Sequence, residues 1–144
     1  MDARRVNDHI TVSSQIGVAD VTAIAAAGFK SIICNRPDGE SLDQTCYADI
    51  AAEALRLGIE IRWQPIVSGL LSDEEGLEFG RIAGTLPSPT FAYCRSGTRC
   101  VVLWSLSEAG KRPVGEIIMT ARHAGYDLAG LEPRIEALAR LTKP

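Results

Sequence analysis

The residues best suited to chemistry form one stretch, Phe91 to Cys100, with the sequence FAYCRSGTRC. A short apolar run of β type ends at Cys94, a polar loop with one glycine and two arginines follows, and an apolar run at helical spacing begins at Val101. This order predicts a strand, a tight loop and the first turn of a helix. Backbone N–H groups at a helix start carry partial positive charge and bind anions, so we expect an anion-binding loop here.

Two side chains of this loop are predicted to be catalytic. The positive field at the helix start stabilises a thiolate, so we expect Cys94 to have a lowered pKa and a nucleophilic sulfur. Arg99 carries a positive charge where the helix dipole disfavours it by about 0.3–1 kcal/mol, and a bidentate grip on a bound oxyanion would explain its presence. Arg95 lies in the loop body and is predicted to face outward, where it either shapes the rim or attracts anionic substrates.

The remaining loop residues are predicted to bind the substrate. Gly97 permits a positive φ, which lets the loop turn with its amides inward. Ser96 and Thr98 contribute backbone N–H groups, and the role of their hydroxyls stays open. Cys100 either faces the core from the first helical turn or acts as a resolving thiol for the oxidised nucleophile. Cys34, at the predicted end of the neighbouring strand, is the alternative thiol partner.

The loop resembles the active-site loops of two related groups of cysteine enzymes, the protein tyrosine and dual-specificity phosphatases and the rhodanese-type sulfurtransferases. In the phosphatase pattern five residues separate cysteine from arginine, whereas here the four residues Arg95 to Thr98 do. Tyr93 stands where phosphatases usually have histidine, and Cys100 where they usually have a hydroxyl residue. Because Cys-Arg-Ser-Gly-x-Arg is also a common rhodanese-like loop, the motif indicates a nucleophilic cysteine without choosing between the two chemistries.

A second motif, Asn35-Arg36-Pro37-Asp38-Gly39-Glu40, lies about sixty residues before the loop. The two motifs together are similar to those of the phosphatase-like domain of the beta-lactamase-hydrolase-like protein family, and the likeness runs from about Ile10 to Leu106. The resemblance implies a phosphatase-like fold. Members of that family are described both as phosphatases and as sulfur transferases, so the resemblance leaves the reaction open.

A phosphatase needs an acid that protonates the leaving oxygen, which contributes roughly 10²–10⁴ in rate. Phosphatases usually carry this aspartate in the loop after the third strand, where this chain has Val67 to Leu71 and no carboxylate before Asp73. Asp38 lies in a loop at the predicted sheet edge and is our candidate general acid, with turn formation as the alternative. Arg36 is predicted either to bind the substrate anion or to pair with Asp38 or Glu40.

The elements that must position these residues follow from hydrophobic periodicity and turn signals. Strands are predicted at Ile10 to Val12 (as an edge strand), Phe29 to Cys34, Ile59 to Trp63 and Phe91 to Tyr93. Helices are predicted from about Val18 to Gly28, Thr45 to Leu57, a Ser72 capping box to about Gly84, the signature loop to Glu108, Val114 to His123 and Pro133 to Leu141.

This alternation predicts an α/β fold with three layers, in which helices cover both faces of a mostly parallel sheet of four to five strands. Ligands of such sheets bind beyond the carboxyl ends of the strands. The segments Cys34 to Asp38 and Pro65 to Leu71 should therefore meet the Cys94 loop at one edge. The protein tyrosine phosphatase-like fold that the resemblance implies agrees with this arrangement.

Bulk properties narrow the classes of protein. A length of 144 residues predicts one domain, residues 1–144. The net charge of −3 argues against a nucleic-acid binder. No apolar run reaches the roughly 20 residues of a membrane helix and no apolar signal core follows the N-terminus, so we expect a cytoplasmic location and no membrane partner. Four cysteines without a Cys-x-x-Cys pair, and two histidines, predict free thiols and no metal or other cofactor.

Three functions are compatible with these patterns. The first is a cysteine-dependent phosphatase that forms a phosphocysteine, and the element order and the family resemblance favour it. The second is a sulfurtransferase that carries a persulfide on Cys94, which the shorter loop favours and which needs no general acid. The third is a non-catalytic anion-binding or redox-sensing module. The expected partner is a small anionic substrate, either a phosphate ester, a phosphoprotein included, or a sulfur donor, bound by a monomer or homodimer.

Overall fold

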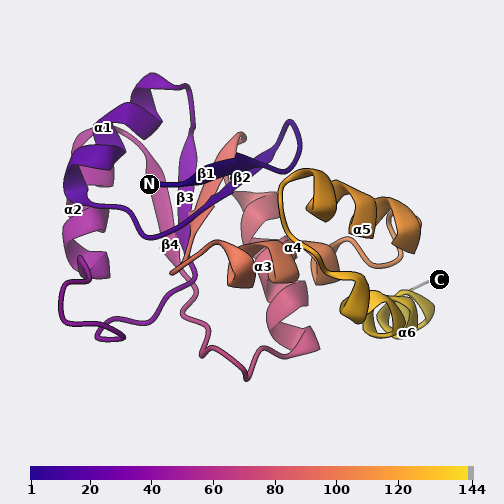
Figure 1. Cartoon of the computed structure of the whole chain (residues 1–144). Coiled ribbons are helices and arrows are strands. Elements are labelled where there is room, and N and C mark those ends of the chain that lie inside the picture. The colour runs from indigo at the N-terminus through magenta and orange to yellow at the C-terminus, as the bar shows by residue number, and fades with distance from the viewer. Residues whose placement is uncertain (143–144) are drawn as a thin grey trace.

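A mixed five-stranded sheet forms the centre of the structure, a computed structural model that describes residues 1–142 (Figure 1). The strand order is β1-β2-β5-β3-β4, and every neighbouring pair except β1 and β2 is parallel. The predicted mostly parallel α/β sheet is therefore confirmed. The strands are β1 (Ala3–Arg5), β2 (Ile10–Ser13), β3 (Ser31–Cys34), β4 (Glu60–Trp63) and β5 (Thr90–Tyr93).

One strand was not predicted, and it changes the place of another. β1 pairs antiparallel with β2 and forms the sheet edge. The predicted edge strand at Ile10 to Val12 is instead an interior strand, buried at all four of its positions. All three residues of β1 are exposed, so no apolar periodicity marked it in the sequence. Backbone pairing joins it to β2.

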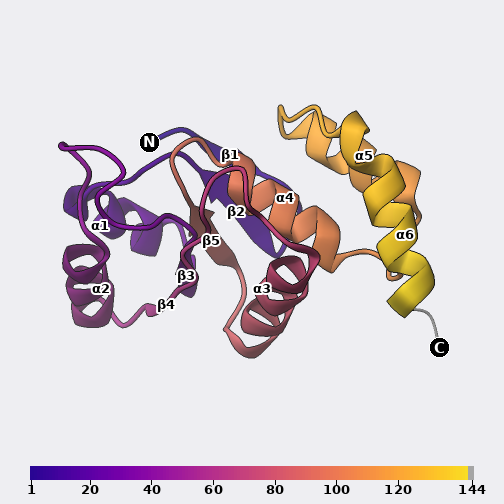
Figure 2. The same ribbon diagram turned by 90° about the horizontal axis from the view of Figure 1, so that it is seen from below.

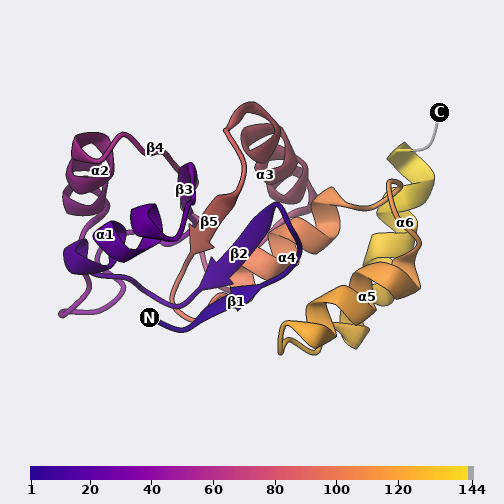
Figure 3. The same cartoon turned by 90° about the horizontal axis from the view of Figure 1, so that it is seen from above.

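Helices cover both faces of the sheet, as predicted. Figures 2 and 3 show α1 and α2 on one face and α3 and α4 on the other, while α5 and α6 pack against α4 on the side away from the sheet. The helices are α1 (Val18–Ala26), α2 (Tyr47–Arg56), α3 (Asp73–Thr85), α4 (Thr98–Ser107), α5 (Val114–His123) and α6 (Glu132–Thr142), with the short 3₁₀ helix η1 (Ala129–Leu131) before α6.

The two central strands carry side chains to two separate cores. β3 and β5 are buried at every position, and successive side chains of a strand point to opposite faces. Ile32 and Phe91 belong to the cluster under α1 and α2, whereas Ile33 and Ala92 belong to the larger cluster under α3 and α4. A continuous apolar run therefore marks a strand that is covered on both faces.

A local sequence signal fixes the start of α3. The predicted Ser72 capping box is present, with the Glu75 N–H donating to Ser72 Oγ over 3.2 Å and the Ser72 N–H donating to Glu75 Oε1 over 2.9 Å. In α2, Ile50 and Ala54 are buried, whereas Leu55 is 80% exposed. No helix within residues 1–142 is long and apolar enough to cross a membrane.

Candidate active site

The Cys94 loop lies at the carboxyl edge of the sheet, between β5 and α4. Its first residue is held by the end of the neighbouring strand, because the Cys94 N–H donates to the Ser13 carbonyl over 3.2 Å. The second segment arrives through Asn35, whose N–H donates to the Tyr93 carbonyl over 2.8 Å, and the third through Ile66, whose N–H donates to the Asn35 carbonyl over 3.2 Å. The three segments that were predicted to converge do meet at one edge.

Gly97 shapes the loop around the sulfur. It precedes the first residue of α4 and has a φ of 91°, a left-handed conformation that glycine adopts without strain. This conformation turns its N–H toward the Cys94 sulfur, 3.1 Å away. A Cβ at this position would overlap the hydroxyl of Tyr126, so both the backbone conformation and the space require glycine.

The sulfur of Cys94 is buried and surrounded by donors. The thiol of Cys100 donates to it and is the largest cause of its low pKa, and the backbone N–H groups of Cys100, Ser96 and Gly97 add to the effect. Burial opposes these donors, and together they lower the pKa of Cys94 to about 5. Cys94 is therefore a thiolate at neutral pH, as a nucleophile must be.

The other two buried thiols, those of Cys34 and Cys100, have raised pKa values. Burial raises the pKa of Cys100 well above its ordinary value, and the neighbouring Cys94 raises it further. Burial likewise raises the pKa of Cys34, whose thiol donates to the Arg36 carbonyl over 3.4 Å. Cys100 thus keeps its proton and serves as a hydrogen-bond donor, where the phosphatase pattern usually places a hydroxyl.

Arg99 reaches across the loop to Glu40. Its Nη1 and Nη2 donate to the two carboxylate oxygens of Glu40 over 2.9 and 2.8 Å, and Nη1 also donates to the Ile66 carbonyl over 2.9 Å. These bonds from Arg99, together with those from Arg36, lower the pKa of Glu40 to about 2. These three bonds use three of the five guanidinium N–H groups. Within residues 1–142 the Nε–H and the second N–H of Nη2 have no partner and are left for a bound anion.

Arg36 supports this ion pair from behind. It is 3% exposed, and its guanidinium donates to Glu40 Oε1 over 2.8 Å, to Gln15 Oε1 over 3.0 Å and to Ser41 Oγ over 3.5 Å. Of the alternatives that the sequence left open for Arg36, the structure has the pair with Glu40. Arg36 holds Glu40, and Glu40 in turn holds Arg99.

The predicted general acid has a structural contact. Asp38 is exposed, and its Oδ1 accepts a hydrogen bond of 2.8 Å from the N–H of Tyr47, the first residue of α2. A carboxylate at a helix N-terminus satisfies an unpaired backbone donor, and its negative charge interacts favourably with the positive end of the helix dipole. Asp38 therefore caps α2, and its role as a proton donor stays a prediction.

The outer residues of the loop face solvent. Arg95, Ser96 and Thr98 are exposed, and the hydroxyls of the last two lie 3.0 Å apart and bond to each other. Arg95 points outward, as predicted. The backbone of Ser96 contributes to the thiolate site while its side chain does not.

Sequence reasoning missed two residues that shape the site. Glu40 belongs to the quoted hexapeptide, and its charge opposite Arg99 was the available signal. Tyr126 follows α5, about thirty residues beyond the loop, and nothing in the sequence marked it. Its hydroxyl donates to the Ser96 carbonyl over 3.0 Å. The loop is thus braced by a segment outside the region that carried the family resemblance.

The described part of the chain holds no cluster of three or more His, Cys, Asp or Glu residues suited to a metal ion. The chemical groups that the site presents are a thiolate, inward-facing amides and one arginine fork. Such a constellation can attack an electrophilic centre that carries negatively charged oxygens, and it can stabilise the charge that develops there.

Comparison with solved structures places the fold. The crystal structure of a proposed phosphatase from Neisseria meningitidis Z2491 is 34% identical, with a TM-score of 0.84 over 96% of this chain and 99% of that one. The core catalytic domain of the PP-IP phosphatase SIW14 from S. cerevisiae has a TM-score of 0.66 at 14% identity, over 98% of this chain and 90% of that one. The second likeness concerns the fold alone, which is protein tyrosine phosphatase-like.

Sequence comparison assigns the family. The pattern of the phosphatase-like domain of beta-lactamase hydrolase-like protein matches residues 2–111. The beta-lactamase hydrolase-like protein of Agrobacterium fabrum (strain C58) is 32% identical over 130 residues, which cover 89% of this chain and 30% of that protein. The chain thus spans about 30% of the length of the curated relative. It belongs to the family of phosphatase-like domains of beta-lactamase hydrolase-like proteins.

Proposed function

We propose that this domain is a cysteine-dependent phosphatase that hydrolyses a small anionic phosphate ester, a phosphorylated protein side chain included. The observation that carries the proposal is the Cys94 sulfur, whose pKa of about 5 makes it a thiolate inside an amide-lined loop. The chain's membership of a phosphatase-like family and its phosphatase-like fold support the same reaction.

In the first step the Cys94 thiolate attacks phosphorus. A sulfur–phosphorus bond forms, the bond from phosphorus to the ester oxygen breaks, and that oxygen leaves with a proton from a general acid. The loop amides and the Nε–H of Arg99 bind the non-bridging oxygens, where negative charge gathers in the transition state. Glu40 keeps the arginine fork oriented, so little reorganisation is needed during the reaction.

In the second step water attacks the phosphocysteine. The new oxygen–phosphorus bond replaces the sulfur–phosphorus bond, inorganic phosphate leaves, and the electron pair returns to the sulfur as a thiolate. The hydrogen bond from the Cys100 thiol stabilises this thiolate as a leaving group, because it lowers the pKa of Cys94. Asp38 stays our candidate for the proton donor of the first step.

Sulfur transfer is the second candidate. The contact that favours it is the bond of Asp38 to the start of α2, because a persulfide mechanism needs no proton donor. The Cys94 thiolate would take the outer sulfur of thiosulfate and release sulfite, and cyanide would then remove this sulfur as thiocyanate. The four-residue spacing of the loop, typical of rhodanese-like loops, agrees with this chemistry.

The experiment that tests the proposal is hydrolysis of 4-nitrophenyl phosphate, with the Cys94→Ser variant as control. We expect turnover by the native chain that the variant lacks. No turnover above the variant, with thiocyanate formed from thiosulfate and cyanide, would replace the proposal by sulfur transfer. Inactivity in both assays with intact phosphate binding would make the domain an anion-binding module.

A further inference from the structure

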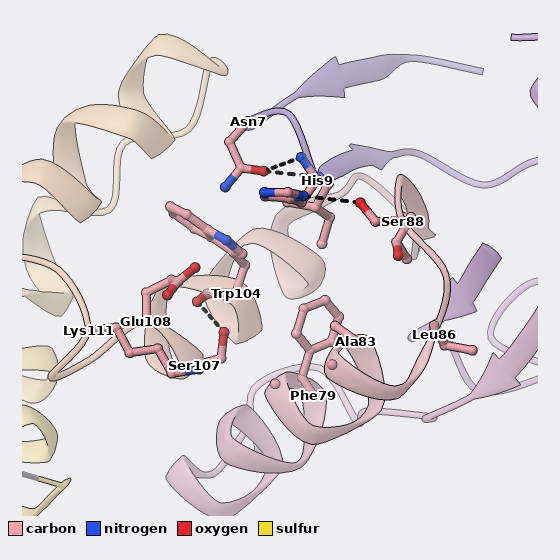
Figure 4. A pocket seen from close by; sticks show the side chains of 14 residues that line it. Asn7, His9, Phe79, Ala83, Leu86, Ser88, Trp104, Ser107, Glu108 and Lys111 are labelled. Carbon is pink, nitrogen blue, oxygen red and sulfur yellow. Dashed lines mark hydrogen bonds between the residues drawn. The ribbon is translucent and has the colours of Figure 1, made fainter. Parts of the chain in front are cut away.

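A pocket lies at the amino ends of the strands, on the opposite side of the sheet's length from the Cys94 loop. It has a volume of about 340 Å³ and opens between α3, α4 and the amino ends of β2 and β5 (Figure 4). Ile10 and Thr90, the first residues of these two strands, line it, whereas Cys94 follows the last residue of β5. The pocket is therefore separate from the candidate active site.

Apolar side chains form most of the pocket wall. Phe79 of α3, Trp104 of α4, Leu86 and Ile10 line it, and all four are buried. The space in front of them is kept open by Gly84, where a Cβ would meet no atom within 4 Å. A preformed apolar cavity of this size is typical of sites for small molecules.

One polar group on this wall lacks a partner. The Trp104 residue as a whole is 4% exposed, but its indole nitrogen is not among the buried polar atoms that lack a partner. The indole N–H has no acceptor within residues 1–142, and it is open to the pocket. Figure 4 shows the ring on the pocket wall, below Asn7 and His9. A ligand oxygen in the pocket would give this donor an acceptor.

The charges at the rim favour an anion. The ammonium group of Lys111 lines the pocket and has no carboxylate within ion-pair distance in the described part of the chain. The one acidic residue on the wall, Glu108, shares Arg112 with Glu116, over 3.6 and 3.2 Å. His9 turns its Nδ1 to the hydroxyl of Ser88, 3.1 Å away, which fixes the ring at the opposite side of the opening.

We propose that this pocket binds a small amphipathic anion of the aryl carboxylate class. The aromatic body packs against Phe79 and Leu86, a carboxylate oxygen accepts the indole N–H of Trp104, and the charge of the carboxylate faces Lys111. This ligand differs from the substrate of the Cys94 loop because it needs an apolar body. The proposal does not depend on which reaction the loop performs.

The test uses sodium 2-naphthoate and nuclear magnetic resonance of the tryptophan indole N–H groups. The chain has two tryptophans, so a Trp63→Phe variant assigns both signals. We expect titration with 2-naphthoate to move the Trp104 indole signal saturably and to leave the Trp63 signal in place. Excess inorganic phosphate, the anion proposed to bind at Cys94, should not change this titration.

Two variants locate the site and its charge. Gly84→Leu should fill the pocket and weaken binding roughly tenfold or more, and its melting temperature verifies the fold. Lys111→Gln should weaken binding about two- to fivefold, as expected for an exposed ion pair, and Lys30→Gln, an exposed lysine elsewhere, should have no effect. An unmoved Trp104 signal, competition by phosphate, or full binding by folded Gly84→Leu would overturn the proposal. Equal binding of neutral 2-naphthylmethanol would overturn its anionic part.

Discussion

At the scale of single residues, the site depends on two thiols with opposite pKa shifts. Cys94 is a thiolate because donors converge on its sulfur, and Cys100 is one of these donors because burial keeps it protonated. A hydroxyl would be a stronger donor than a thiol. The chain therefore stabilises the Cys94 thiolate with a weaker donor than the hydroxyl usual in phosphatase loops.

The first prediction concerns the pH dependence of this nucleophile. The thiolate is the reactive form, so alkylation of Cys94 by iodoacetamide should rise as the pH increases through about 5 and then level off. Cys100→Ala removes the largest cause of the low pKa, and the rise should move to higher pH. Both profiles are measured in a Cys46→Ser background, since Cys46 is partly exposed. Superimposable profiles would mean that the Cys100 thiol does not stabilise the thiolate.

The second prediction concerns Glu40. Hydrogen bonds to charged groups contribute about 1.5–3 kcal/mol, so Glu40→Gln should lower kcat/KM roughly tenfold or more by loosening Arg99. The pKa of Glu40 is lowered to about 2, so this carboxylate stays charged as the pH falls to about 3 and produces no step near neutrality. Glu53→Gln, which breaks an exposed pair with Arg56 on α2, is the matched control. Unchanged kinetics in Glu40→Gln would show that Glu40 does not position Arg99 for the reaction.

At the scale of secondary-structure elements, the start of α2 decides what Asp38 does. The same carboxylate is our candidate acid and the partner of the Tyr47 N–H. The structural contact and a catalytic acid make different demands. The amide oxygen of asparagine can accept the same hydrogen bond, but asparagine cannot deliver a proton to a leaving oxygen.

The third prediction separates these two roles. Asp38→Asn should keep the free energy of unfolding within about 0.5 kcal/mol, measured by urea denaturation, and should lower turnover of an aryl phosphate roughly 10²-fold. Asp38→Ala should in addition lose about 1 kcal/mol of stability, because it removes one hydrogen bond. Full activity of Asp38→Asn would show that Asp38 is a cap alone, and the general acid would then have to be sought elsewhere.

At the scale of the whole molecule, a segment near the C-terminus completes a loop near the middle of the chain. Tyr126 lies after α5, and its hydroxyl donates to the Ser96 carbonyl. Gly97 has no side chain and leaves room for the same hydroxyl. The last helices are therefore more than a cover for α4, because the segment between α5 and η1 fixes the shape of the anion loop.

The fourth prediction is a double-mutant cycle across this contact. Tyr126→Phe removes one hydrogen bond and should cost about 0.5–1.5 kcal/mol of stability. Gly97→Ala should cost more, since a positive φ alone is unfavourable by about 1–3 kcal/mol for alanine and its Cβ overlaps the Tyr126 hydroxyl. The double variant should lose less than the sum, because the overlap is relieved. Thermal denaturation measures all three, and strictly additive losses would contradict the contact.

The sequence by itself determined most of the elements of this protein and the local structure around Cys94. A strand, a glycine turn and a helix start around Cys94 are local features, because they depend on neighbouring residues and on backbone geometry. The parallel order of the strands followed from their alternation with helices, and it placed Asn35 and Ile66 at the same edge as the loop. These inferences succeeded because period and turn chemistry act over a few residues.

The tertiary structure alone decided the partners of the side chains. Whether Arg36 faces a substrate or Glu40, and whether Asp38 faces the loop or α2, depends on rotamers and packing that no spacing encodes. The sequence did not predict β1, because an exposed strand has no apolar periodicity. It did not predict the role of Tyr126, because a lone tyrosine far along the chain gives no local signal. Long-range contacts are selected by the packed core, and only the folded molecule shows which of them formed.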